Sequence, residues 1–185
     1  MNLLKFNGEM IDAILEGRKT QTRRPIKEFT FFEPHPYELG FWIVEGPEPR
    51  DLIDDEDRII PAGTNTRWTV IDRGLDYYCP YGRKWNYINF HNKSGLPFGE
   101  LFLSNVRVER LQDIKEEDAI AEGIKTGRFG NESNWRDGFY IPGNNQPYLS
   151  AKEAFKHLWI SIYSEENWNA NSWVWVIEFR RINNE

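Results

Sequence analysis

A short basic segment near the start of the chain carries the residue types best suited to chemistry. The whole chain has a net charge of −6, yet five basic residues fall within ten positions: Arg18, Lys19, Arg23, Arg24 and Lys27. Guanidinium groups at this density suit a local phosphate anchor, so Arg18, Arg23 and Arg24 are the predicted nucleotide- or phosphate-binding residues. A solvated basic loop that balances the acidic segment 51–57 is an equally weighted alternative.

Lys19 and Thr22 lie in this segment and are candidate catalytic residues. A lysine acts as a base only when its amine is deprotonated. Crowding by the neighbouring arginines and burial would lower the pKa of Lys19, whereas a nearby carboxylate would raise it. The sequence leaves open which effect dominates. Taken alone, a Lys-x-x-Thr pattern is more often structural than catalytic.

Glu122 is the third candidate catalytic residue. It falls at the end of a predicted short helix, directly before Gly123. A carboxylate there faces the negative end of the helix dipole, which favours the protonated form that a general acid needs. The alternative is an exposed glutamate of an ordinary acidic helix, which is the more frequent case.

The remaining reactive residue types form no pattern. His35, His91 and His157 are scattered without metal-ligand spacing, so no metal and no cofactor are predicted. Cys79 is the only cysteine, which excludes an intramolecular disulfide and makes the cytoplasm the expected location. No apolar run approaches the roughly 20 residues of a membrane span, so no membrane association is predicted.

The elements that must position the candidate residues begin with a strand at residues 3–6. Asn7 then caps a predicted helix whose apolar face is formed by residues recurring at helical spacing, namely Met10, Ile11, Ile14 and Leu15. Gly17 is well placed as the residue that ends this helix. The basic segment therefore falls in a loop and the start of the next strand.

A strand and a short helix are predicted in the middle of the chain. The apolar residues of the strand at 101–110 change phase near Asn105, which indicates a bulge. Asp113 and Glu116 have the spacing of a capping box and predict the short helix that carries Glu122.

The last third predicts one helix and one buried strand. Ser150 and Glu153 form a second capping-box pattern, followed by an apolar stripe: Ala154, Phe155, Leu158, Trp159 and Ile162. Residues 173–181 are apolar on both faces as far as Glu178, which is typical of a largely buried strand.

Two long segments are harder to interpret. Residues 29–96 contain candidate strands at 41–45, 67–72 and 76–79, and the turn-rich stretch 80–96 is predicted to be irregular. Residues 125–148 are rich in Gly, Asn and Pro and predict a long loop, of a length that is usually functional or disordered. Its aromatic residues Trp135, Phe139 and Tyr140 could stack on a base, form a lid or anchor the loop.

The residues from Ala13 to Arg24 resemble the signature loop of ASCH domains: a helix, then Gly-x-Lys, then Thr-x-Arg. Later blocks at 106–114, 119–123 and 175–179 also resemble the family, whose bacteriophage and prophage members are the most similar. The resemblance implies an α+β fold, a PUA-like mixed β-barrel with a few flanking helices. A single domain, 1–185, is expected, with long inserted loops at about 29–96 and 125–148.

The same resemblance implies recognition of a nucleotide or RNA, with a modified nucleoside as one expected ligand. Some small family members are amidohydrolases that deacylate N4-acetylcytidine, and others are described as ribonucleases. The lysine, threonine and glutamate of the amidohydrolases match Lys19, Thr22 and Glu122. The lysine would activate the threonine or a water, and the glutamate would protonate the leaving amine. A third alternative is a phage accessory protein that binds a protein partner through the long loops and keeps a vestigial cleft.

Overall fold

The computed structural model describes residues 3–26 and 79–182 in full and, between them, the backbone of five short strands. These strands form two small antiparallel sheets, β3-β6-β7 and β4-β5. Their bounds are β3 (Phe41–Pro47), β4 (Leu52–Ile53), β5 (Ile59–Ile60), β6 (Thr66–Asp72) and β7 (Leu75–Tyr78). The three strands predicted in this region coincide with β3, β6 and β7.

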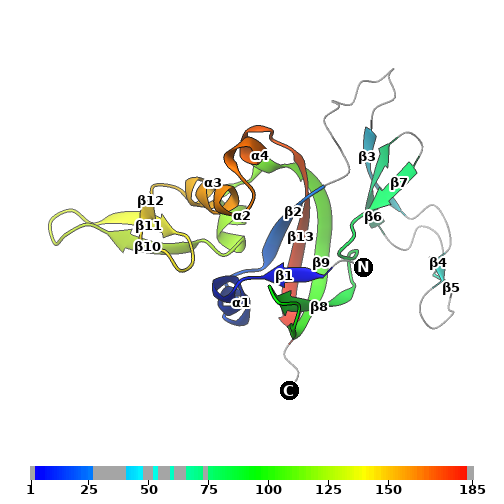
Figure 1. The fold of residues 1–185 in the computed structure, drawn as a ribbon, viewed down its shortest axis with the longest axis horizontal. Helices are drawn as coiled ribbons and strands as arrows, with labels where there is room; N and C mark the ends of the chain where they lie inside the picture. The colour runs from blue at the N-terminus through cyan, green and yellow to red at the C-terminus, as the bar shows by residue number, and fades with distance from the viewer. Residues whose placement is uncertain are drawn as a thin grey trace.

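A curled five-stranded sheet forms the body of the protein and bends into a half-barrel (Figure 1). Its strand order is β1 (Leu4–Phe6), β8 (Tyr87–Asn92), β9 (Pro97–Arg110), β13 (Trp173–Ile182) and β2 (Gln21–Pro25). Only the β1–β8 pairing is parallel. The fold is thus a mixed, barrel-like α+β fold, as predicted at this coarse level. The strand β8 corrects the expectation that residues 80–96 are irregular.

The long strand β9 carries the predicted bulge. Opposite it on β13, Glu178 pairs with Asn105 and the next residue, Phe179, pairs with Leu103. Ser104 is therefore the extra residue, beside the position that the phase change indicated. A bulge bends its strand and increases the local twist, which lets a strand as long as β9 follow the curl of the half-barrel.

Helix α1 (Gly8–Leu15) begins and ends as predicted. The Asn7 side chain accepts a hydrogen bond from the Met10 amide at 2.9 Å, and Gly17 has a φ of 74° directly after the C-cap. One residue of the predicted apolar face is an exception, since 37% of Leu15 is exposed.

Helix α2 (Glu116–Ala121) follows a 3-10 turn at Leu111–Asp113, and its start corrects the predicted capping box. Asp113 lies in the 3-10 turn, and the N-cap is Lys115, whose side chain makes no capping bond. Glu116 instead accepts a hydrogen bond from the Ala151 amide at 2.6 Å, at the start of the next helix. A contact distant in sequence thus replaced the local cap.

Helix α3 (Ala151–Ile162) packs against α2, and the short helix α4 (Glu165–Asn169) follows α3 and packs against it (Figure 1). The hydroxyl of Ser150 caps α3 by accepting from the Glu153 amide at 3.0 Å, as predicted. The helix buries most of the expected stripe, namely Ala154, Phe155, Leu158 and Trp159. Ile162 differs from the prediction, because 59% of it is exposed.

Residues 125–148 form a three-stranded sheet, which corrects the predicted long loop. Its strands are β10 (Lys125–Phe129), β11 (Arg136–Tyr140) and β12 (Pro147–Tyr148), and it extends away from the half-barrel in Figure 1. Gly127 and Gly138 pair directly across the first hairpin, and the ring of Tyr140 covers one while the ring of Phe129 covers the other. Cross-strand aromatics of this kind stabilise strands that contain glycine. The hairpin was missed because the prediction relied on the Gly, Asn and Pro content of this segment.

Candidate functional site

A cavity of about 320 Å³ lies where β1 and β2, the two edge strands of the half-barrel, approach each other. Arg24 on β2 spans this gap, because its Nη2 donates to the Lys5 carbonyl of β1 at 3.0 Å. The cavity is lined by β1, the start of α1, β2, the last residue of the α2 segment, the turn after β8 and one side of α3. The lining residues include all three predicted catalytic residues: Lys19, Thr22 and Glu122.

Backbone hydrogen bonds fix the loop between α1 and β2 against three other elements. The Lys19 amide donates to the Ala13 carbonyl of α1 at 2.9 Å, and the Thr20 amide donates to the Ala121 carbonyl of α2 at 2.9 Å. The Thr20 carbonyl in turn accepts from the Phe179 amide of β13 at 2.8 Å. The turn at Gly17 therefore places Lys19 at the C-terminal end of α2, next to Glu122.

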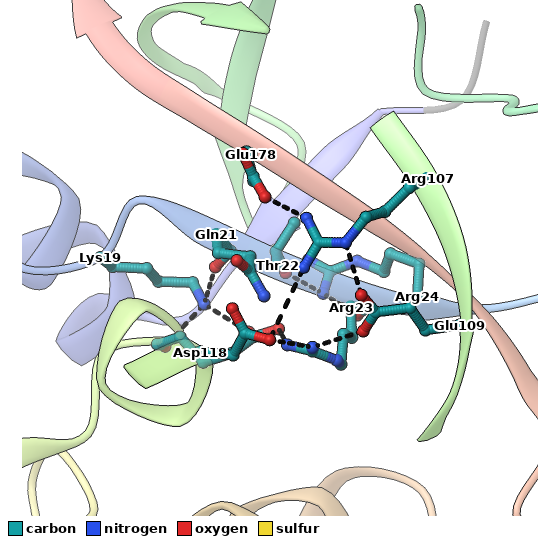
Figure 2. A network of polar contacts seen from close by, with 10 residues as sticks. Lys19, Gln21, Thr22, Arg23, Arg24, Arg107, Glu109, Asp118 and Glu178 are labelled. Atoms are coloured by element: carbon teal, nitrogen blue, oxygen red, sulfur yellow. Dashed lines mark hydrogen bonds and ion pairs between the residues drawn. The ribbon is translucent and has the colours of Figure 1, made fainter. Parts of the chain in front are cut away.

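Lys19 is a buried cation with three acceptors (Figure 2). Its Nζ donates to the Gln21 carbonyl at 2.8 Å, the Glu122 carbonyl at 2.7 Å and the Glu122 carboxylate at 2.9 Å. Three acceptors match the three N–H groups of an ammonium. Burial lowers the pKa of Lys19 below its ordinary value; Glu122 opposes this, while Arg24 and Arg23 add to it. Burial is the dominant effect, which the sequence had left open.

Glu122 is the C-cap residue of α2 and is buried, with 4% of its surface exposed, so the exposed-glutamate alternative is wrong. Its two carboxylate oxygens have separate partners. One binds Lys19, and the other lies 3.3 Å from Nη1 of Arg23. Lys19 and Glu122 are 103 residues apart in sequence, and they meet as an ion pair at the floor of the cavity.

Arg23 lies fully buried behind this pair and is held by three carboxylates (Figure 2). Besides Glu122, its Nη2 contacts Glu109 of β9 at 3.0 Å and Asp118 of α2 at 3.1 Å. The side chain has no exposed surface. Its charge is therefore neutralised inside the protein, which gives it a structural role, and its role in phosphate binding stays a prediction.

Arg107 extends the ion network on the outer side. It pairs with Glu109 and Glu178 and lies 3.6 Å from Asp118. Sequence reasoning missed Arg107, Glu109 and Asp118. The alternation of Arg107 and Glu109 on one strand gave no spacing that would distinguish these residues from ordinary surface charges.

Thr22 and Arg24 share one face of β2 and are hydrogen-bonded to each other (Figure 2). Nη1 of Arg24 donates to the Thr22 hydroxyl at 2.7 Å and to the Arg23 carbonyl at 3.0 Å. The hydroxyl oxygen thus accepts from Arg24, and its own proton can be donated elsewhere. Only 1% of Thr22 is exposed. The Arg24 guanidinium also lies over the ring of Phe6, 5.2 Å from its centre.

The three predicted phosphate-binding arginines therefore have three different environments. Arg18 does not line the cavity, and its Nε donates to Glu16 at the surface at 2.6 Å. Arg23 and Arg24 both line the cavity, but the Arg23 side chain is buried in the ion network, whereas Arg24 contacts no carboxylate of the described residues.

The wall opposite β2 is formed by α3 and was not predicted as part of a site. Phe155, Trp159 and Tyr163 contribute to the lining, one helical turn apart. Burial raises the pKa of Tyr163, and the nearby charge of Arg24 opposes that rise. The stripe of α3 gave a usable signal, since Tyr163 continues the four-residue spacing of Phe155 and Trp159. Trp135, Phe139 and Tyr140, considered for base stacking, are not among the lining residues.

Two further properties concern the described residues alone. None of their His, Cys, Asp and Glu side chains gather in a group of three or more that could hold a metal ion. Nor does any helix in that part of the chain combine the length and the apolar character needed to cross a membrane.

The fold and the site define a class: a mixed α+β half-barrel whose two edge strands flank a largely apolar cavity that contains a buried lysine–glutamate pair. Comparisons with protein-family models, with curated proteins and with solved structures gave no match to the chain.

Proposed function

We propose that the chain is a PUA-like module of the ASCH type that binds a nucleotide or a segment of RNA in the cavity between β1 and β2. The observation that carries the proposal is the convergence of Lys19, Thr22, Arg24 and Glu122 on one hollow of about 320 Å³. Small-molecule sites commonly measure about 300–1,000 Å³ and combine an apolar lining with a few polar groups. The cavity has this composition.

The lining supplies the two kinds of contact that a nucleotide needs. The side chains of Phe155, Trp159 and Tyr163 give an apolar and aromatic wall, suited to the flat face of a base. The opposite side offers the Thr22 hydroxyl and the guanidinium group of Arg24. If the chain were a protein-interaction module, we would expect a vestigial, closed cleft. The open cavity favours binding of a small ligand over that alternative.

A binding screen tests the proposal. Common and modified nucleosides, nucleotides and short RNAs are titrated against the protein while its tryptophan fluorescence is recorded, and the hits are repeated with Arg24→Ala. Arg18→Ala is the matched control, because Arg18 lies outside the cavity. We expect at least one ligand whose binding is weakened by Arg24→Ala and not by the control. Binding that both variants leave unchanged, or no binding at all, refutes the proposal.

A second function, hydrolysis of an acylated cytidine, is favoured by the contact between Lys19 and Glu122. The three acceptors around Lys19 hold it as an ammonium, so it has no free lone pair in this state. Transfer of one proton from Lys19 to Glu122 would create an amine base and a carboxylic acid side by side. The amine could then deprotonate Thr22 or a water, and the acid could protonate the leaving amine.

In this reaction water adds to the acetyl carbonyl, the C–N bond breaks, and acetate and cytidine are released. Incubation with N4-acetylcytidine, followed by chromatography of the cytidine formed, tests it. Lys19→Ala should abolish turnover, and Lys125→Ala, an exposed lysine on β10, should not. Equal background turnover in all three proteins removes the hydrolase function for this substrate and leaves the binding proposal standing.

A further inference from the structure

Arg24 differs from the other arginines of the site because its hydrogen-bond partners among the described residues are all uncharged. Its two terminal nitrogens donate to the Thr22 hydroxyl, the Arg23 carbonyl and the Lys5 carbonyl. By contrast, Arg18, Arg23 and Arg107 each contact at least one carboxylate. No carboxylate of the described residues forms an ion pair with Arg24. The guanidinium is therefore held in one orientation at the cavity wall, with no counter-ion from the part of the chain that the structure describes.

Lys93 adds a second cation that lacks an acidic partner among the described residues. It is exposed and lines the same cavity, in the turn that follows β8. The backbone of this turn is fixed by Asn92, whose side chain accepts from the Leu96 amide at 3.0 Å and whose carbonyl accepts from the Gly95 amide at 2.9 Å. Register also places the turn at the site, since Asn92 pairs with Phe6 of β1.

Tyr163 supplies a hydroxyl on the facing helix wall. It lines the cavity, and the Arg24 charge is close enough to act on its ionisation. Within the described part of the chain, this hydroxyl makes no hydrogen bond. Arg24, Lys93 and Tyr163 therefore present N–H and O–H donors from three separate elements of the fold.

We propose that Arg24, Lys93 and Tyr163 form a phosphate subsite of the cavity, so that its ligand is a phosphate-bearing nucleotide or RNA strand and not a free nucleoside. The inference rests on the function proposed above and narrows it. Phosphate oxygens are acceptors, and an oriented guanidinium with a nearby ammonium is the set of donors that binds them most strongly.

The distribution of charge in the cavity also predicts how the ligand is oriented when it binds. At the floor of the cavity Lys19 and Arg23 are neutralised by carboxylates, and Glu122 would repel a phosphate placed there. The phosphate therefore lies at Arg24 and Lys93, and the base points toward the Lys19–Glu122 pair and the α3 wall. The base of the ligand thus contacts Lys19, Thr22 and Glu122, the residues proposed to catalyse hydrolysis.

Calorimetric titration of the whole chain at low and at physiological salt tests the subsite. The probes are the common nucleosides, their 5′-monophosphates and a single-stranded RNA of about eight nucleotides, a length within the usual range of single-strand sites. We expect a monophosphate or the RNA to bind about tenfold or more tightly than the matching nucleoside, with a preference that weakens as salt increases. In Lys93→Gln and Arg24→Gln, the ratio of the nucleoside Kd to the nucleotide Kd should fall toward one. In Lys125→Gln, that ratio should stay unchanged.

The outcomes separate the two proposals. A nucleoside that binds as tightly as its nucleotide, or a preference that Lys93→Gln and Arg24→Gln both leave intact, overturns the phosphate subsite while the proposed function survives. Absence of binding by every probe, together with a negative result for every ligand of the first screen, overturns both. If the RNA shows the Arg24 and Lys93 dependence and the monophosphates do not bind, the subsite is supported and its phosphate is an internal diester. Because Lys93 is exposed, Lys93→Gln remains informative even if Arg24→Gln does not fold.

Discussion

Replacing Arg23 with methionine tests whether the ion network behind the cavity holds the fold together. Methionine keeps an unbranched apolar side chain and removes only the guanidinium. That group is fully buried and lies 3.0, 3.1 and 3.3 Å from the carboxylates of Glu109, Asp118 and Glu122. Its loss leaves three carboxylates facing the space it occupied.

The cost depends on which carboxylates can find other partners. Glu109 and Asp118 are 25% and 22% exposed, so water can reach them, and both keep their contacts with Arg107. Glu122 is only 5% exposed and keeps a single cation, Lys19. Removing one partner of a buried ion pair costs about 3–5 kcal/mol. Since one cation remains beside Glu122, we expect a loss of about 4 kcal/mol in the free energy of unfolding, a large share of the usual 5–15 kcal/mol or so.

Urea unfolding followed by tryptophan fluorescence and by circular dichroism measures this loss. With a slope of about 2 kcal/mol per molar urea, the midpoint should fall by about 2 M. Arg18→Met is the matched control: the Arg18–Glu16 pair is 32% and 58% exposed, and such surface pairs contribute at most about 1 kcal/mol. A midpoint for Arg23→Met no lower than that of Arg18→Met would refute the reasoning. The double variant Arg23→Met/Glu122→Gln should lose less unfolding free energy than the two single variants lose in sum, because either change alone already removes the contact between Arg23 and Glu122.

Two further predictions concern other parts of the fold. Burial raises the pKa of the Cys79 thiol to about 12 from 9.0, so alkylation by iodoacetamide at pH 9 should be about 500-fold slower in the folded protein than in urea, because the thiolate fraction differs by that factor. Since the folded pKa is the higher one, the thiol also contributes stability that is complete below about pH 9 and is lost as the pH rises toward 12; equal alkylation rates would contradict both statements. Gly130 has a φ of 128°, and a Cβ there would lie 2.1 Å from the Asn134 carbonyl oxygen, so Gly130→Ala should destabilise the β10–β11 hairpin by about 1–3 kcal/mol. Gly8→Ala is the control, because a Cβ at Gly8 meets nothing within 4 Å; thermal unfolding and amide exchange of the hairpin compare the two.

Much of the half-barrel could be predicted because its signals are local. Asn7 and Ser150 cap the helices they precede, and the phase change near Asn105 marks a real bulge. Each of these depends on residues a few positions apart, where hydrogen-bond geometry and side-chain alternation are set by the chain itself. The predicted capping box at Asp113 was wrong because Glu116 makes a contact distant in sequence: it accepts a hydrogen bond from the first residue of α3.

The candidate site was predicted in part for the same reason. The basic segment and the end of α2 identified Lys19, Thr22 and Glu122, and these residues line one cavity. The roles of the neighbouring arginines could not be separated, because charge in a sequence does not show which guanidinium will face carboxylates. Arg23 and Arg24 are adjacent in β2, so alternation sends them to opposite faces of the strand and into different environments.

The ion network explains how an acidic chain could form the phosphate subsite that we propose. Glu122, Asp118 and Glu109 neutralise Lys19 and Arg23 from within, so the positive charge that remains toward the cavity comes from Arg24, Lys93 and Lys5. At physiological ionic strength a charge acts over about 8 Å, which confines their influence to the cavity and keeps the other acidic surfaces from cancelling it. Such a site suits one or two phosphates held in place, whereas a protein that tracks a nucleic-acid backbone needs an extended basic surface. The net charge of −6 and the proposed phosphate subsite are therefore consistent with each other.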